Sequence, residues 1–147
     1  MMNYNKGLQI FIVDDDPFYR ELFGQYLRNY GFSRIKMFEN GQQCLNQLTD
    51  SPDIILLNHQ MTPIDGLETL KKIKRFDPNI FLIFVSGQRN TKVAMNALEY
   101  GAVEYIVKGD DGEEDRIACI MDEILEMKAT LQKNKSGWLR RVINAFS

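Results

Sequence analysis

The chain is poor in cysteine and histidine and has no long hydrophobic run, and each shortage excludes a class of protein. Cys44 and Cys119 lie far apart without metal-ligand spacing, so we expect two small buried apolar residues and no disulfide or zinc site. No apolar stretch reaches the roughly 18 residues that predict a membrane-spanning helix. The apolar run at residues 8–13 is also too short for a signal peptide, which leads us to expect a cytoplasmic protein.

Positive charge is scarce in most of the chain and is concentrated at its end. The 147 residues include 18 lysines and arginines against 20 aspartates and glutamates. Residues 1–127 hold all 20 acids and 13 of the bases, whereas residues 128–147 hold five bases and no acid. An acidic body lacks the basic face that binds phosphate backbones, so we expect no nucleic-acid binding by this domain.

Short apolar runs alternate with segments of helical periodicity along the chain. Five strands are predicted, at residues 8–13, 35–38, 53–58, 80–86 and 103–108. The first helix is expected between Asp16–Pro17 and Gly31, and others near 40–49, 66–76, 90–100 and 112–131. Strands that are apolar without alternation are covered on both faces. The pattern therefore predicts a doubly wound α/β fold, with a five-stranded parallel sheet and helices on both faces.

The end of the chain is predicted to differ from the rest. Residues 1–131 are expected to form one domain, and the last long helix has an apolar stripe predicted to face the core: Ile117, Ile120, Met121, Ile124, Leu125 and Leu131. Residues 132–147 are predicted to form a linker, QKNKSG, and a short basic amphipathic helix with Trp138 and Val142 on its apolar face. Such a helix fits a partner groove or an anionic membrane. We favour packing on the body or on another protein, because one short basic helix has little membrane affinity.

Polar residues stand where the predicted strands end. Asp14 and Asp15 follow the first strand, Asn58 ends the third, Ser86 ends the fourth and Lys108 ends the fifth. The carboxyl ends of parallel strands share one edge of the sheet, so these side chains should converge there. Carboxylates suit Mg²⁺, while a lysine and a hydroxyl suit phosphoryl oxygens. The group therefore predicts a site for metal-assisted phosphoryl chemistry.

Four motifs, each in its own strand–helix unit, together resemble the receiver domain of bacterial response regulators over residues 8–131. They are IVDDD (12–16), LLNHQMTPIDG (56–66), VSG (85–87) and YIVKG (105–109). The resemblance implies a flavodoxin-like fold with strand order 2-1-3-4-5 and a signalling role in two-component phosphorelays. It also implies no enzymatic function, and a sensor histidine kinase or downstream signalling protein as partner. A homodimer is compatible with it.

The resemblance also assigns roles to individual residues. It implies that Asp14 and Asp15 form an acidic pocket, with Ser86 and Lys108 contacting the phosphoryl group. Mg²⁺ would be held by Asp15, by position 58 and by the backbone carbonyl of Gln60. Ser86 and Tyr105 match the pair that switches conformation.

Position 58 matches the aspartate that accepts the phosphoryl group, but this chain has asparagine there. An amide is not a carboxylate nucleophile, and the loss of one negative charge should weaken Mg²⁺ binding. Three interpretations stay open: a native atypical receiver that signals through protein contacts, an introduced block to phosphorylation, or a structural asparagine in another kind of protein.

An enzyme of a different family is the second hypothesis. The segment IVDDDPF also fits the Asp-x-Asp opening of haloacid-dehalogenase-like phosphatases, which use Mg²⁺. Asp14 would then be the nucleophile and Asp16 the general acid and base. That family normally has acids after its fourth strand, where this chain has Ser86 and Gly87.

Overall fold

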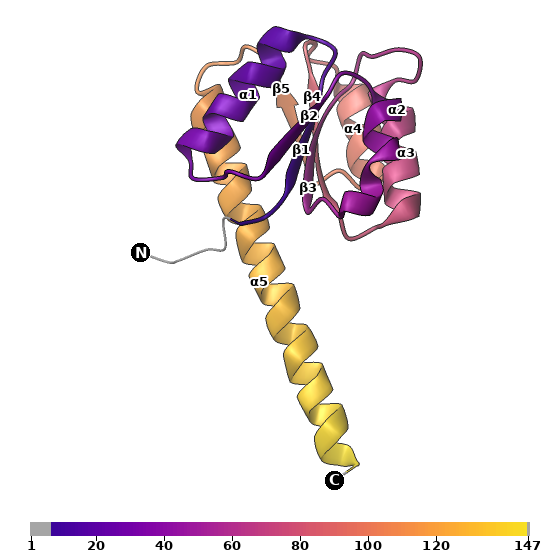
Figure 1. The fold of residues 1–147 in the computed structure, drawn as a ribbon, viewed down its shortest axis with the longest axis vertical. Helices are drawn as coiled ribbons and strands as arrows, with labels where there is room; N and C mark the ends of the chain where they lie inside the picture. The colour runs from indigo at the N-terminus through magenta and orange to yellow at the C-terminus, as the bar shows by residue number, and fades with distance from the viewer. Residues whose placement is uncertain (1–6, 147) are drawn as a thin grey trace.

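The computed structural model describes residues 7–146 and contains a five-stranded parallel sheet in the order β2-β1-β3-β4-β5 (Figure 1). This is the predicted doubly wound fold. The strands are β1 (Ile10–Val13), β2 (Ile35–Phe38), β3 (Ile54–Asn58), β4 (Phe81–Ser86) and β5 (Glu104–Val107). The helices are α1 (Pro17–Asn29), α2 (Gly41–Asn46), the 3₁₀ turn η1 (Leu48–Asp50), α3 (Gly66–Phe76), α4 (Thr91–Glu99) and α5 (Glu113–Ala145).

Two apolar cores lie on opposite faces of the sheet, because successive strand residues point in opposite directions. In β1, Ile10 and Ile12 pack with α1 and α5, whereas Phe11 and Val13 pack with α2, α3 and α4. Figure 1 shows the same division, with α1 and α5 on one side and α2, α3 and α4 on the other. Central strand residues are therefore fully buried on both faces, which explains their unbroken apolar sequence.

Short polar side chains begin the first four α-helices and hold the loops at one edge of the sheet. The side chains of Asp16, Asn40, Asp65 and Asn90 accept hydrogen bonds from backbone N–H groups in the first turns of α1, α2, α3 and α4. Each bond satisfies a donor that has no partner within the helix. The chain therefore leaves each of these strands through an ordered turn, and the strand-end residues have fixed positions.

The last helix is longer than the sequence analysis predicts. Residues 132–137, predicted as a linker, are helical. Helix α5 is 33 residues long in all, and its second half extends away from the body (Figure 1). Leu131, predicted to face the core, is 60% exposed, because α5 has left the sheet by that point. The segment has no proline, and Gly137 costs a helix only about 1 kcal/mol relative to alanine, which does not end it.

The two cysteines lie in different environments. Cys44 is buried, as expected, but Cys119 is exposed because it lies on the solvent side of α5. Burial raises the pKa of the Cys44 thiol to about 12. None of the helices in residues 7–146 combines the length and apolar character needed to cross a bilayer.

Candidate functional site

The carboxyl edge of the sheet brings together the predicted site residues. Lys108 Nζ lies 2.7 Å from Asp14 Oδ2, joining the ends of β5 and β1. Asn58 Nδ2 lies 3.4 Å from Asp15 Oδ1, joining the ends of β3 and β1. Ser86 ends β4, and its carbonyl accepts a hydrogen bond from the Lys108 N–H at 2.8 Å. Residues up to 94 positions apart in the chain thus form one cluster.

Asp14 and Lys108 form a buried ion pair beneath the pocket. Their side chains are 2% and 9% exposed. Asp14 also accepts a hydrogen bond from the Asp16 N–H at 2.9 Å. Burial raises the pKa of the Asp14 carboxyl above its ordinary value, and the hydrogen bond from Lys108 opposes that rise. The Lys108 ammonium is therefore paired with the Asp14 carboxylate, which fixes its position.

Asn58 joins two other groups of the site through its amide. The side chain is 4% exposed, and Nδ2 donates to the Gln60 carbonyl at 2.8 Å and to Asp15 Oδ1 at 3.4 Å. These two oxygens are the ones that the receiver resemblance assigns to Mg²⁺, together with position 58. In this structure the amide N–H groups bind both of them.

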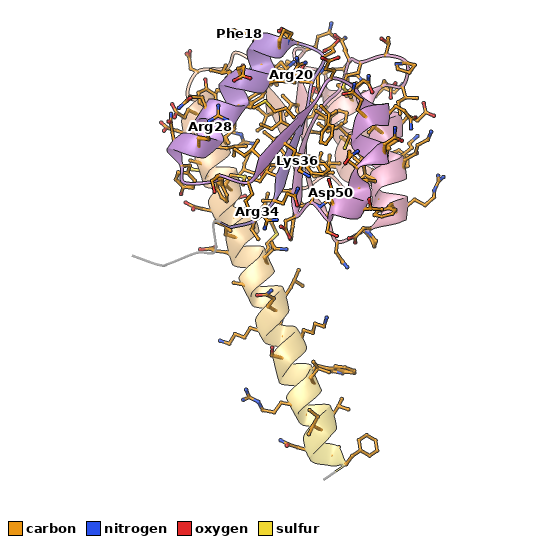
Figure 2. The ribbon with its side chains drawn as sticks, in the orientation of Figure 1. Phe18, Arg20, Arg28, Arg34, Lys36 and Asp50 are labelled. Carbon is orange, nitrogen blue, oxygen red and sulfur yellow. The ribbon has the colours of Figure 1, made fainter. Side chains whose placement is uncertain are left out.

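An open pocket of about 510 Å³ lies over this cluster. Its lining residues are Asp15, Asp16, Pro17, Tyr19, Asn58, Gln60, Gly87 and Lys108. Phe18, which is 64% exposed, stands at the start of α1 at the same end of the molecule (Figure 2). Asp14 and Ser86 are almost fully buried, so the pocket presents Asp15 as its most accessible charged oxygen donor near Asn58.

The oxygens around the pocket suit Mg²⁺ in kind but carry little charge. Asp15 supplies a carboxylate, while Asn58 and Gln60 supply neutral carbonyls. The second carboxylate, on Asp14, is already paired with Lys108. Across residues 7–146, three side chains of the His, Cys, Asp or Glu type do not gather anywhere in a metal-binding arrangement. Asp15 and the two carbonyls could hold a cation, with water completing its coordination.

A short chain of hydrogen bonds links Ser86 to Tyr105. The Gln88 N–H donates to Ser86 Oγ at 3.2 Å, and the Tyr105 hydroxyl donates to the Gln88 carbonyl at 2.8 Å. The Tyr105 ring stacks on Phe84 with centroids 6.2 Å apart. A displacement of Ser86 would therefore be transmitted to Tyr105 through one loop residue.

Two residues of the site were not predicted from the sequence. The Lys108 ammonium lies 4.3 Å from the centroid of the Tyr19 ring, a cation–π contact. Glu113 is 8% exposed and accepts hydrogen bonds from the Gly109 N–H and the Tyr26 hydroxyl. The position of Tyr19 in the first turn of α1, beside the three aspartates, was a signal that could have identified it. Glu113 offered no such signal.

Comparison with known proteins identifies the family. The response regulator receiver domain family matches residues 10–118. The chain is 33% identical to the chemotaxis protein CheY of Bacillus subtilis, over 68% of this chain and 84% of that protein. It is 32% identical to the transcriptional regulatory protein ZraR of Klebsiella oxytoca, over 80% of this chain but 26% of ZraR. The chain thus spans about a quarter of the length of that relative.

Solved structures agree with these sequence matches. The CheX–CheY–BeF₃–Mg²⁺ complex of Borrelia burgdorferi matches with a TM-score of 0.70 and 26% identity, over 75% of this chain and 83% of that one. The family match covers most of the chain, and the sheet has the strand order of receiver folds. This chain therefore belongs to the response regulator receiver domain family, whose members act in two-component signalling.

Proposed function

We propose that this receiver domain signals through protein contacts alone, because Asn58 stands at the phosphoacceptor position. The observation that supports this proposal is the location of Asn58. It ends β3 at the carboxyl edge, beside Asp15 and the Asp14–Lys108 pair. An acyl phosphate forms when a carboxylate oxygen attacks phosphorus, and the amide of Asn58 carries no such charged nucleophile.

The Asn58 amide N–H groups also bind oxygens that a cation would otherwise bind. They bind the Asp15 carboxylate and the Gln60 carbonyl, both of which a bound Mg²⁺ would need. Mg²⁺ would have to displace these hydrogen bonds and would gain one carboxylate fewer than in a receiver with aspartate at this position. We therefore expect Mg²⁺ to bind weakly.

The other site residues keep roles that do not require phosphorylation. Asp14 and Lys108 stabilise the pocket as a buried pair, while Ser86 and Tyr105 connect it to the surface formed by α4, β5 and α5. Met95 and Leu98 are exposed on α4 of that surface. A sensor histidine kinase or a downstream signalling protein is the expected partner, and no enzymatic activity is expected. No observation favours the phosphatase hypothesis, in which the buried, lysine-paired Asp14 would be the nucleophile.

Phosphorylation with a small phosphodonor tests the proposal. The protein and its Asn58→Asp variant are incubated with acetyl phosphate and Mg²⁺, and the intact masses are measured. We expect a phosphoryl adduct on Asn58→Asp and none on the unmodified chain. Asn58→Ala is the matched control, since it removes the amide without adding a carboxylate, and it should also remain unmodified.

An adduct on the protein with Asn58 intact would overturn the proposal. If Asn58→Asp folds and still forms no adduct, the assignment of position 58 as the phosphoacceptor position would be wrong. Circular dichroism of each variant establishes that it is folded.

A further inference from the structure

The half of α5 that extends beyond the body carries charge of one sign. Residues 128–147 hold five bases and no acid. The first base, Lys128, pairs with the body, since its Nζ lies 3.4 Å from Asp53 Oδ1. The other four lie on the part of α5 that Figure 2 shows extending into solvent: Lys133, Lys135, Arg140 and Arg141. A binding partner of this segment should therefore be negatively charged, and a second copy is repelled because it brings the same four bases.

The last turns of α5 present an apolar face between these bases. At 3.6 residues per turn, five large apolar side chains fall within an arc of about 140°: Trp138, Leu139, Val142, Ile143 and Phe146. Arg140 and Arg141 lie one on each side of that arc. Trp138 is 57% exposed and Phe146 is 89% exposed. Within residues 7–146 the two apolar cores end at Leu125, so the body does not cover this face.

The surface of an anionic bilayer matches this arrangement. A helix that lies in the plane of a bilayer buries one apolar face and keeps both of its flanks at the level of the lipid phosphates. An arginine on each flank reaches those phosphates, because its long apolar stem extends the charge toward the polar layer. Aromatic rings such as those of Trp138 and Phe146 are favoured at the same level. A groove on a protein would instead need acids on both of its walls.

Helix α5 supplies this segment in a folded form. An isolated helix of about ten residues is marginal in water, whereas residues 138–146 continue a helix that is anchored in the core by Ile117 and Ile124. A helix that is already formed loses less conformational entropy on binding than a segment that must fold.

The direction of the apolar face requires a bend. Trp138 follows Ile124 by two intervals of seven residues, so it lies on the side of α5 that packs against the sheet. A bilayer on that side of a straight helix would meet the body. Ser136 and Gly137 are the place for a bend, because kinks occur at such pairs and a Cβ added to Gly137 would meet no atom within 4 Å.

We propose that residues 138–146 bind the surface of an anionic lipid bilayer, with their apolar face in the headgroup region and a bend at Ser136–Gly137. Residues 129–137 then form a spacer of roughly 14 Å, at 1.5 Å per residue. That length exceeds the Debye length of about 8 Å at physiological salt, so repulsion between the acidic body and the lipids is largely screened. The proposal does not depend on the role of Asn58.

Sedimentation of the full chain with lipid vesicles tests the proposal. The protein should bind vesicles of phosphatidylserine and phosphatidylcholine in equal parts at least about tenfold more tightly than vesicles of phosphatidylcholine alone. Arg140→Gln with Arg141→Gln should weaken binding about thirtyfold, because each base near an anionic surface contributes roughly a factor of five. Lys71→Gln with Lys72→Gln is the matched control, since it removes the same charge from α3 of the body, and it should bind as the unmodified chain does.

Two outcomes of the sedimentation experiment would overturn the proposal. If the unmodified chain does not bind the phosphatidylserine vesicles, an acidic groove on a protein becomes the expected partner. If both double variants lose binding equally, the attraction comes from the whole charge of the chain and not from residues 138–146.

Trp138 reports insertion directly, because it is the only tryptophan in the chain. Its fluorescence should shift to shorter wavelength when the phosphatidylserine vesicles are added, and lipids brominated on their acyl chains should quench it. Ile143→Ser with Phe146→Ser keeps every charge and should weaken binding at least about tenfold. A short-wavelength emission before vesicles are added would show that the body or a second copy covers the face. Binding without a shift would show that charge alone holds the protein, and either result would overturn the proposal.

Discussion

Asn58 changes the balance of charge at one position without changing its shape. The asparagine amide fills the space of an aspartate, yet it donates hydrogen bonds where a carboxylate would only accept them. In a receiver site with an aspartate here, three carboxylates would repel one another until a cation bound. In this chain the site is already held together by N–H donors and by the Asp14–Lys108 pair.

Replacing Asn58 with aspartate should therefore make the stability of the fold depend on Mg²⁺. Without metal, we expect Asn58→Asp to be less stable by about 1 kcal/mol, because a third carboxylate joins Asp14 and Asp15. With Mg²⁺ the variant should gain more stability than the unmodified chain. Urea midpoints of both proteins with and without Mg²⁺ measure this. A clearly lower midpoint for the unmodified chain without metal would contradict the argument.

The titration of Asp14 provides a second measurement at this scale. Burial raises the pKa of its carboxyl above the usual 3.8, and the Lys108 hydrogen bond lowers it. We expect a titration midpoint above 3.8 by carboxyl-detected NMR, and a further rise in Lys108→Met. Because the folded pKa is the higher one, the native state binds more protons. The contribution of Asp14 to stability is therefore largest below pH 3.8 and is lost as the pH rises through the folded pKa.

At the scale of elements, local signals and tertiary packing explain different boundaries. The starts of α1, α2, α3 and α4 follow from Asp16, Asn40, Asp65 and Asn90, whose side chains accept backbone hydrogen bonds. These starts could be predicted because a cap acts within three residues. The end of α5 could not be predicted in this way, because the polar stretch at 132–137 contains nothing strong enough to end a helix.

Gly137 is the weakest point of the extended half of α5. An added Cβ would meet no atom within 4 Å, so Gly137→Ala should stabilise the helix by about 1 kcal/mol without a steric penalty. Hydrogen exchange of the amides in residues 132–145 should slow. Gly137→Pro is the contrasting variant, and it should accelerate exchange there because proline breaks a helix. Equal exchange in all three proteins would mean that the segment is not helical in solution.

At the scale of the whole molecule, the body contains the apolar cores, whereas the extended half of α5 is largely exposed to solvent. From residue 129 to residue 146 the residues are exposed, except for the half-buried Gly137 and Val142. The two apolar cores contain no residue beyond Leu125. The stability of the single chain should therefore reside in the sheet and the helices around it.

Removal of residues 132–147 should leave the stability of the monomer unchanged. At low protein concentration we expect the shortened and full-length chains to unfold within about 0.5 kcal/mol of each other. Thermal unfolding of both chains at the same low concentration measures this difference. A large loss of stability at low concentration would show that the segment packs on its own body.

The sequence by itself determined the order of the elements, the double-wound class and the residues at the strand ends. Apolar periodicity and helix caps act over a few positions, so they can be read along the chain. The convergence of Asp14, Asp15, Asn58, Ser86 and Lys108 followed from one topological rule about parallel strands.

Only the tertiary structure decided which of these groups touch. Tertiary packing brings Tyr19 to Lys108 and Tyr26 to Glu113. No local sequence pattern specifies such pairs, because their members are far apart in the chain. Packing also decided that Leu131 and Cys119 face solvent, because a periodic stripe says which side of a helix is apolar but not where the covering sheet ends.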